Sequence, residues 1–275
     1  MPWERASGGD SVRLDQALTE RGLVSSRSRA QAAVLAGLVC VNGERVTKAG
    51  HDVRADDTIR VEAPAHPWAS RGGVKLDGAL RALGLSPKGL VCLDAGASTG
   101  GFTDVLLTFG ASRVHAVDVG YGLIDWRLRN DPRVVLHERQ NVRYLTPEIV
   151  GEPVDFVTLD LSFIGLEKVF GAVQSTLGPN WQVILALVKP QFQVGKGKVG
   201  RGGVVRDPKL HLEAMEAVAR AGQERGWHLA GATPSPIRGP EGNVEFWLAL
   251  TPGAGGGDVD LGAVALAGAL ARKGP

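Results

Sequence analysis

Short apolar runs alternate with segments of helical apolar spacing through the larger, C-terminal part of the chain. Helical spacing separates most of the runs, and it is clearest from Lys209 to Arg225. This alternation is typical of an α/β fold in which helices cover a doubly wound, mostly parallel sheet. The runs that predict strands are residues 90–93, 114–117, 134–136, 156–159, 182–187 and 227–230.

The last predicted strand departs from this alternation. Residues 243–250 form another apolar run, but only the loop 234–242 separates it from the strand before it. A crossover to a parallel neighbour needs about a dozen residues or more. We therefore expect the last strand to run antiparallel to its neighbours.

A smaller α+β module precedes the sheet. Apolar spacing predicts a helix that starts near Leu14 and stops at Gly22. A second helix is expected to begin with Ser25 or Ser26 as its cap and to stop at Gly37. Short strands follow, the first two joined by a tight Asn-Gly turn, at residues 39–41, 44–46 and 58–61.

These elements divide the chain into two folded units, a linker and a tail. The linker contains prolines, which disfavour helix and favour an extended spacer. In the tail, the Ala/Leu stretch 261–270 predicts a terminal helix, to which we assign no function. The expected boundaries are 11–62 for the module, 63–70 for the linker, 71–250 for the sheet domain and 251–275 for the Gly-rich tail.

The composition narrows the class of protein. With 275 residues, 44% of them hydrophobic, the chain can bury a sizeable core, and its net charge of +2 gives no overall basic field. The N-terminus lacks a basic-then-apolar signal segment, and no apolar run approaches the ~18 residues of a membrane span. Cys40 and Cys92 lack zinc-site spacing, so we expect free thiols, no metal and a cytoplasmic location.

Charged residues recur where the predicted strands end. Asp94, Asp118, Asp160 and Lys189 each follow a strand, and Glu245 lies near the start of the antiparallel one. Ligands of doubly wound sheets bind beyond the carboxyl ends of the strands. These side chains therefore predict a single site along one edge of the sheet.

The glycine-rich turn after the first of these strands allows three interpretations of the ligand. The dinucleotide pattern fails because Ser98 replaces the second glycine of G-x-G-x-x-G. The same residues match the G-x-S-x-G turn of hydrolases, which also needs a histidine partner. The histidines considered for that role all lie outside recognisable motifs, so we interpret them as core or surface residues: His115, His137, His211 and His228.

S-adenosylmethionine is the third interpretation. Its binding needs a glycine-rich turn and a carboxylate on the second strand for the ribose hydroxyls, which Asp118 supplies. Asn141 follows the third strand, where its amide can meet the adenine edge or cap a turn. The predicted cofactor-binding residues are Asp94, Gly96, Ser98, Thr99, Gly100, Gly101, Phe102, Thr103, Asp118, Asn141 and Asp160.

Two basic clusters are candidates for contact with a polyanion. One lies at the start of the second helix of the module, where cations oppose the helix dipole and a bound anion relieves that cost. The other lies between Lys189 and Arg206, a glycine-rich stretch without acids that we expect to be mobile. For both, a solvated surface is the alternative. The predicted RNA-binding residues are Arg21, Arg27, Arg29, Lys196, Lys198, Arg201 and Arg206.

The module resembles the S4-type RNA-binding domain, which is named after a small-subunit ribosomal protein. The similarity lies in Arg13-Leu-Asp-Gln-Ala-Leu, Ser-Arg-Ser-Arg-Ala, Gly37-Leu-Val-Cys-Val-Asn-Gly and Asp57-Thr-Ile-Arg-Val. This resemblance favours RNA over a solvated surface as the interpretation of the first cluster.

Four motifs of the sheet domain resemble the Lys-Asp-Lys-Glu tetrad of FtsJ-type ribose 2′-O-methyltransferases. They are Ser70-Arg-Gly-Gly-Val-Lys-Leu, Leu159-Asp-Leu-Ser-Phe-Ile, Leu187-Val-Lys-Pro-Gln-Phe and Gly242-Asn-Val-Glu-Phe. The predicted catalytic residues are accordingly Lys75, Asp160, Lys189 and Glu245.

With its N-terminal module, the chain resembles the TlyA family, also called hemolysin A, from about residue 11 to 250. The resemblance implies a Rossmann-like class I methyltransferase fold, S-adenosylmethionine as cofactor, and methylation of cytidine ribose in ribosomal RNA of the small and large subunits. One departure is Gln193, where a glutamate is expected. It leaves the tetrad intact but removes any role for a carboxylate at that position.

The tetrad suits the chemistry, because a ribose hydroxyl is a poor nucleophile that must be aligned with an activated methyl group and lose its proton. Lys189 is expected to lie closest to the hydroxyl, as a general base or, together with Lys75, as a cation that stabilises the alkoxide. Asp160 and Glu245 would orient the lysines. The residues leave the choice between base and cation open.

Three other functions were weighed against an RNA ribose methyltransferase. A membrane-active cytolysin lacks support, because the sequence has no signal peptide and no strongly amphipathic basic helix. A pseudouridine synthase needs no cofactor, so tight S-adenosylmethionine binding would exclude it. A non-catalytic RNA binder predicts no effect of Lys189→Ala. The expected partners are ribosomal RNA or ribosomal subunits and no membrane, with a monomer favoured.

Overall fold

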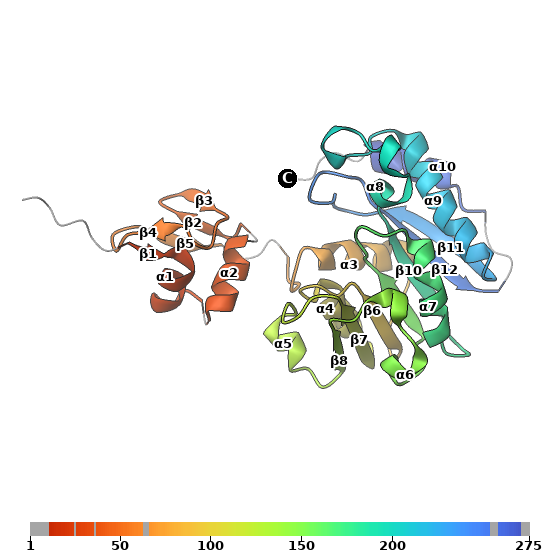
Figure 1. Cartoon of the computed structure of the whole chain (residues 1–275), viewed down its shortest axis with the longest axis horizontal. Helices are drawn as coiled ribbons and strands as arrows, with labels where there is room; N and C mark the ends of the chain where they lie inside the picture. Colours follow the sequence, from red (N-terminus) through yellow and green to blue (C-terminus); the bar gives the residue numbers. More distant parts are fainter. Residues whose placement is uncertain (1–10, 25, 36, 63–65, 254–257, 271–275) are drawn as a thin grey trace, which may run out of the picture. The chain divides into compact units, whose positions relative to one another are not determined.

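The computed structural model describes residues 11–24, 26–35, 37–62, 66–253 and 258–270 (Figure 1). The chain forms two compact units, residues 1–67 and 68–275. Each unit has its own hydrophobic core, so each is described by itself.

The first unit contains the predicted helices and strands. Helices α1 (Leu14–Glu20) and α2 (Arg27–Leu35) precede an antiparallel sheet in the order β3-β2-β5. Ser26 is the cap of α2, since its Oγ accepts a hydrogen bond from the backbone N–H of Arg29 at 3.4 Å. The strands of this sheet are β2 (Val39–Val41), β3 (Glu44–Val46) and β5 (Ile59–Val61). A further antiparallel pair joins β1 (Val12–Arg13) to β4 (Asp52–Val53), which the sequence did not predict because each strand has only 2 residues.

A buried carboxylate of α1 contacts α2 in the first unit. Asp15 is fully buried, and its oxygens accept hydrogen bonds from Arg13 at 3.0 Å, Gln31 at 2.8 Å and Arg27 at 3.3 Å. The Arg13 guanidinium holds the pKa of the Asp15 carboxyl well below its usual range. Asp15 therefore fixes the start of α1 to α2 by charge-assisted hydrogen bonds.

The second unit is built on a sheet in the order β11-β12-β10-β9-β6-β7-β8 (Figure 1). The neighbours from β10 to β8 pair in parallel, whereas β12 is antiparallel to both β10 and β11. This confirms the doubly wound sheet and its antiparallel last strand. The strands are β6 (Val91–Ala95), β7 (Arg113–Asp118), β8 (Val134–Glu138), β9 (Phe156–Leu159), β10 (Val183–Val188), β11 (Trp227–Pro234) and β12 (Phe246–Pro252).

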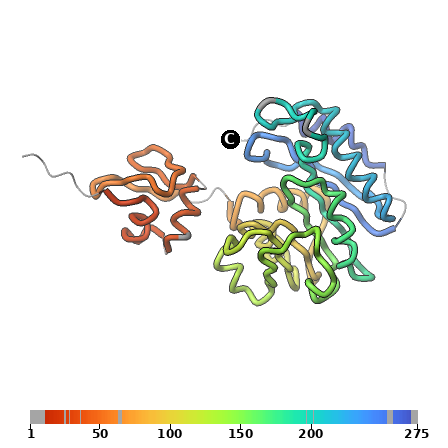
Figure 2. The backbone as a smooth tube through the Cα atoms, in the orientation of Figure 1, coloured from red at the N-terminus to blue at the C-terminus, as the bar shows by residue number. Residues whose placement is uncertain are grey.

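Helices cover both faces of this sheet. The α-helices are α3 (Gly72–Leu83), α4 (Gly101–Thr108), α5 (Trp126–Arg129), α6 (Pro147–Val150), α7 (Phe170–Thr176), α8 (Pro190–Gln193), α9 (Pro208–Gln223) and α10 (Leu261–Leu270). Single 3-10 turns are η1 (Val142–Tyr144), η2 (Leu166–Lys168), η3 (Lys196–Lys198) and η4 (Arg201–Gly203). Helix α10 packs against α9 and β11, and all three belong to the blue part of the backbone tube in Figure 2.

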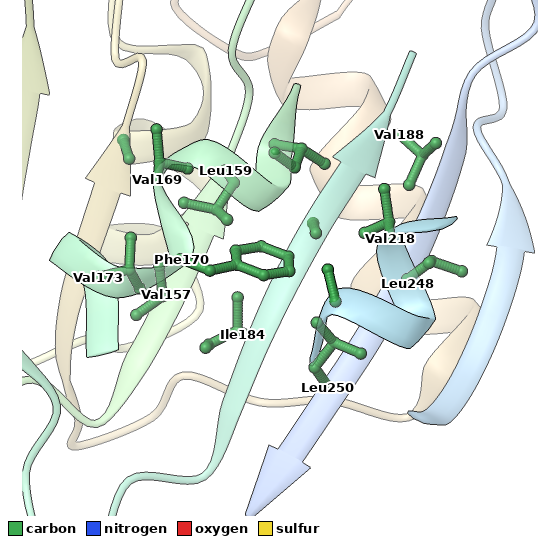
Figure 3. Close-up of a cluster of buried hydrophobic side chains, with 14 of the residues drawn as sticks. Val157, Leu159, Val169, Phe170, Val173, Ile184, Val188, Val218, Leu248 and Leu250 are labelled. Atoms are coloured by element: carbon green, nitrogen blue, oxygen red, sulfur yellow. The ribbon is translucent and has the colours of Figure 1, made fainter. Parts of the chain in front are cut away.

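Alternation along the buried strands divides the core between the two faces. Figure 3 shows one of them, where Phe170 of α7 lies among Val157, Leu159 and Ile184 of the sheet, with Val218 of α9 nearby. On the opposite face, α3 and α4 pack against side chains that alternate with these in sequence, including Phe156, Leu185 and Trp247. Burial on both faces explains why β10 is a continuous apolar run.

One segment differs from its predicted form, and a second, in the tail, has the predicted form but packs on the sheet domain. The stretch between Lys189 and Arg206, expected to be a loop, contains the short helices α8, η3 and η4. The terminal helix predicted at 261–270 is present as α10, and its buried Ala265 joins the core of the second unit. The described part of the tail therefore belongs to the sheet domain.

Candidate active site

The turn between β6 and α4 has a backbone that favours glycine. Gly96 and Gly100 both have φ of 94°, and Ser98 has φ of 49°. A Cβ at Gly96 would lie 2.3 Å from the carbonyl oxygen of Asp160, and one at Gly100 would lie 2.4 Å from Leu128 Cδ1. The turn therefore lies directly against its neighbours, while Ser98 and Thr99 at its tip are exposed.

The residues on either side of this tip are structural anchors. Asp94 is fully buried and accepts a hydrogen bond from Thr103 Oγ1 at 2.7 Å, which ties the end of β6 to α4. Burial raises the pKa of Asp94 to about 7. Gly101 begins α4, and the Phe102 ring packs against Trp247 with 5.4 Å between ring centroids. Among the predicted cofactor-binding residues of this turn, Ser98 and Thr99 are therefore the ones that are exposed to solvent.

Asp118, at the end of β7, organises the next turn. Its carboxylate accepts hydrogen bonds from the backbone N–H groups of Ser98 at 2.8 Å and Gly120 at 2.7 Å. A hollow opens beside it that combines apolar walls with carboxylates. The hollow is lined by Ala97, Ser98, Ala116, Asp118, Gly120, Leu123, Ile124, Leu136 and Glu138.

Glu138, which the sequence analysis did not select, is a second carboxylate in this hollow. It ends β8, accepts a hydrogen bond from Gly122 N–H at 2.7 Å and forms an ion pair with Arg129. Arg129 holds the pKa of the Glu138 carboxyl below its ordinary value. Glu138 could have been predicted from the sequence, because it ends a strand as Asp118 does. Asn141 lies just beyond as the cap of η1, where its Oδ1 accepts from Arg143 N–H at 3.0 Å.

The four tetrad residues form two lysine–carboxylate pairs. Lys75, on α3, donates a hydrogen bond to Glu245 Oε2 at 2.6 Å, and their side chains are only 7% and 1% exposed. The Lys189 ammonium lies 2.6 Å from Asp160 Oδ1 in an ion pair, and it donates a hydrogen bond to Ser162 Oγ at 3.0 Å. Ser162, like Glu138, is a residue that the sequence analysis missed.

The sheet register explains how distant parts of the sequence reach this edge. Ala95 pairs with Leu159, so Asp160 follows directly beside the glycine turn, and its N–H donates to Ala95 O at 3.0 Å. Val188 pairs with Phe246 on the antiparallel strand, so Lys189 and Glu245 extend from neighbouring positions. The predicted single rim is therefore present, and β12 contributes to it only because it runs in the opposite direction.

Two of the histidines weighed for a hydrolase have other partners. His115 is buried in β7, with Nδ1 3.0 Å from His137 Nε2 and Nε2 2.9 Å from Glu152 Oε1. Burial lowers the pKa of both His115 and His137, which favours their neutral forms. The buried His115 and the half-buried His137 link β7 to β8, in agreement with their interpretation as core or surface residues.

The basic residues predicted to bind RNA are less free than the sequence suggests. The Arg21 guanidinium donates to the carbonyl oxygens of Arg54 and Asp57, each at 2.6 Å, and Arg27 pairs with the buried Asp15. Arg29 is exposed on α2. Arg21 and Arg27 therefore have structural partners, although their guanidinium groups keep exposed surface.

The second basic cluster is described in part. Lys198 forms an ion pair with Glu213 of α9, so an acid lies beside this acid-free stretch of sequence. Arg206 is exposed. The side chains of Lys196 and Arg201 lie outside the described part of the structure. Gln193 ends α8, where its amide can donate to Glu167 Oε2 at 3.2 Å and accept from Leu166 N–H at 3.0 Å.

Comparisons with known proteins match both units of the chain to known families. The FtsJ-like methyltransferase family matches residues 68–251, and the S4 domain matches residues 12–59. A 16S/23S rRNA (cytidine-2′-O)-methyltransferase, TlyA of Mycobacterium tuberculosis, is 50% identical over 87% of this chain and 89% of its own length. Hemolysin A of Brachyspira hyodysenteriae is 38% identical over 86% of this chain and 98% of its own length.

A solved structure extends the similarity to the fold. A protein of Streptococcus thermophilus that carries the name hemolysin shares 36% identity with this chain, covers 95% of it and 96% of its own length, and superposes with a TM-score of 0.73. Within the described residues, none of the helices combines the length and apolar character needed to cross a membrane.

Proposed function

This chain belongs to the FtsJ-like methyltransferase family, and we propose that it transfers the methyl group of S-adenosylmethionine to the 2′-hydroxyl of a cytidine in ribosomal RNA. The observation that carries the proposal is the pairing of Lys75 with Glu245 and of Lys189 with Asp160 on one rim beside the glycine turn. The TlyA relative, at 50% identity, supports ribosomal RNA as the substrate.

The residues that line the hollow beside Asp118 have the chemistry that an adenosine group needs. Apolar side chains such as Leu123, Ile124 and Leu136 provide walls for a flat heterocycle, and Asp118 provides acceptors for a ribose diol. The backbone at the exposed tip of the glycine turn and Asp160, at the neighbouring end of β9, are then available to contact the remaining part of S-adenosylmethionine. S-adenosylmethionine supplies an electrophilic methyl group when it is bound.

The residues of this chain have to align the ribose hydroxyl and stabilise the negative charge that develops on its oxygen. Lys189 is held by Asp160 and Ser162 from two sides, so its ammonium has a fixed position at the rim. Lys75 is held by Glu245 in the same manner. Of the two roles left open by the sequence, the ion pairs favour lysines that act as cations preorganised for an alkoxide.

The decisive experiment is methyl transfer from labelled S-adenosylmethionine to ribosomal subunits and to naked ribosomal RNA, followed by mapping of the modified nucleotide. The expected product is a 2′-O-methylcytidine. Bound cofactor without transfer to any of these substrates would overturn the proposal, and a methyl group on a base would exclude ribose chemistry.

A pair of lysine variants separates catalysis from binding. Lys189→Met removes the rim ammonium at similar side-chain length, so we expect transfer to fall at least about a hundredfold while S-adenosylmethionine still binds in calorimetry. Lys88→Met, at an exposed lysine of the same domain, is the matched control and should retain full activity. Full activity of Lys189→Met would show that the Lys189 ammonium takes no part in the reaction.

A further inference from the structure

Asn243 is a buried amide that the mechanism above does not use. It lies just before β12, and it is 1% exposed. Its Oδ1 accepts a hydrogen bond from Val205 N–H at 2.9 Å, and its Nδ2 donates one to Gly203 O at 2.9 Å. The Asn243 side chain thus pairs with one backbone N–H and one backbone carbonyl of the segment 203–205, as the backbone of a neighbouring strand would do.

The segment held by Asn243 is the end of the basic stretch 196–206. The chain leaves the sheet at the end of β10, passes through α8 into this stretch, and reaches the exposed Arg206 at its end. Val205 is buried in the core, and its carbonyl oxygen accepts a second hydrogen bond, from His211 Nε2 of α9 at 2.9 Å. The basic stretch is therefore anchored beside Arg206 by two buried side chains from different elements.

Asn243 also belongs to the turn that carries Glu245. Its carbonyl oxygen accepts from Gly239 N–H at 2.9 Å, which closes residues 239–243 into a turn. A Cβ at Gly239 would lie 2.7 Å from Glu245 Oε1, so the turn packs directly against that carboxylate. Asn243 and the carboxylate that holds Lys75 therefore lie against the same turn.

We propose that Asn243 is a positioning residue that couples binding of RNA by the basic stretch 196–206 to the placement of Glu245 and Lys75. This inference rests on the proposed function. Contact with the phosphate backbone of RNA fixes the position of Arg206 and its neighbours. The hydrogen bonds of the Asn243 side chain then fix the turn 239–243 relative to this stretch. That turn fixes Glu245, and with it the buried ion pair to Lys75. Binding of the substrate by the basic stretch then also determines the geometry of the Lys75–Glu245 pair.

Asn243→Asp is the sharpest test, because it keeps the shape and the acceptor for Val205 N–H but cannot donate to Gly203 O. We expect kcat on ribosomal substrate to fall about ten- to a hundredfold, while the dissociation constant for S-adenosylmethionine stays unchanged. Val173→Ala, at a buried core residue of α7, is the control for lost stability alone. It should lower the melting temperature without lowering kcat.

A double-mutant cycle distinguishes coupling from a merely structural role. Arg206→Ala should lower kcat clearly in the wild-type background and much less in the Asn243→Asp background. Additive losses would overturn the proposal, as would wild-type kcat in Asn243→Asp. If Asn243→Asp melts below the assay temperature, His211→Phe loosens the same segment from α9 and must give the same non-additivity with Arg206→Ala.

Failure of the two proposals would look different. If the wild-type protein transfers no methyl group to ribosomal RNA or subunits, the proposed function is wrong, and the coupling falls with it. If the wild-type protein is active and the cycle is additive, only the role of Asn243 is refuted.

Discussion

Lys75 and Glu245 face each other with almost no contact with solvent, so neither charge can be removed alone without leaving the other buried. Breaking a buried ion pair in this way costs roughly 3–5 kcal/mol, because the remaining charge is no longer compensated. The pair therefore contributes to folding as well as to the proposed chemistry.

Glu245→Gln should lower the free energy of unfolding by about 3 kcal/mol and reduce methyl transfer at least about a hundredfold. Chemical denaturation and the transfer assay measure the two effects. The double variant Lys75→Met, Glu245→Leu should recover most of the stability, because an apolar pair avoids the desolvation cost, yet remain inactive. Recovered activity in the double variant would show that the pair is structural only.

Asp94 gives the stability of the protein a pH dependence of unusual sign for a carboxylate. Because burial raises its pKa to about 7, the folded state keeps the proton where the unfolded state has already lost it. The contribution is complete below about pH 4 and is lost as the pH rises through 7, so unfolding becomes easier across that window.

The expected size of this decline is up to about 4 kcal/mol between pH 4 and 7. Asp94→Asn removes the titrating group and should flatten this part of the curve in urea denaturation series. Asp77→Asn, at a half-buried aspartate of α3, is the control and should keep the wild-type slope. An equal slope in Asp94→Asn and wild type would contradict the assignment.

The contacts of some site residues could be predicted from the sequence, and those of others could not. Asp118 and Lys189 were recognisable because they end strands, where the topology alone determines the side of the sheet. Ser162 and Asn243 were not, since their importance comes from partners many residues away. Arg27 was predicted to contact RNA, and its pairing with Asp15 arises from the packing of α1 on α2.

At the scale of elements, the glycine turn after β6 lies in close contact with the residues that follow β9. Gly96→Ala adds a methyl group 2.3 Å from the Asp160 carbonyl in a left-handed backbone, so both strain and a clash result. Strain alone costs about 1 kcal/mol, whereas the clash must move backbone.

We expect Gly96→Ala to be destabilised by clearly more than Gly151→Ala and to lose binding of S-adenosylmethionine. Gly151 has φ of 86° but open space around a Cβ, so it isolates the strain. Thermal melts and calorimetry with the cofactor test this. Similar melting temperatures and intact binding in both variants would mean that the turn can shift.

The strands of the sheet were predictable to within a few residues because each is a short apolar run between turn residues. Helix α3 was not, since Gly72 and Gly73 weaken its local propensity. Its position is set by packing: a Cβ at Gly73 would overlap Trp68, so the glycine admits the indole. The short helices between Lys189 and Arg206 were missed because glycines dominate that stretch.

At the scale of the whole molecule, each unit has a core that it does not share with the other. Residues 68–275 should therefore fold and bind S-adenosylmethionine without the first unit. We expect this fragment to match the affinity of the full chain for the cofactor but to lose most transfer to ribosomal subunits, with the loss greatest at high salt.

Calorimetry and transfer assays at several salt concentrations check this expectation. The isolated first unit, residues 11–67, should bind ribosomal RNA by itself with an affinity that falls steeply with salt. Full transfer activity of the 68–275 fragment would remove the first unit from substrate recognition.

The position of β12 has a consequence for synthesis of the protein. Because β12 is the last strand in sequence but lies between β10 and β11, a nascent chain that has reached β11 still has an open edge along β10. That edge is an apolar, hydrogen-bonding surface of the kind that promotes aggregation. The same strand brings Glu245, so the ribosome must finish nearly the whole chain before the sheet closes and the rim is complete.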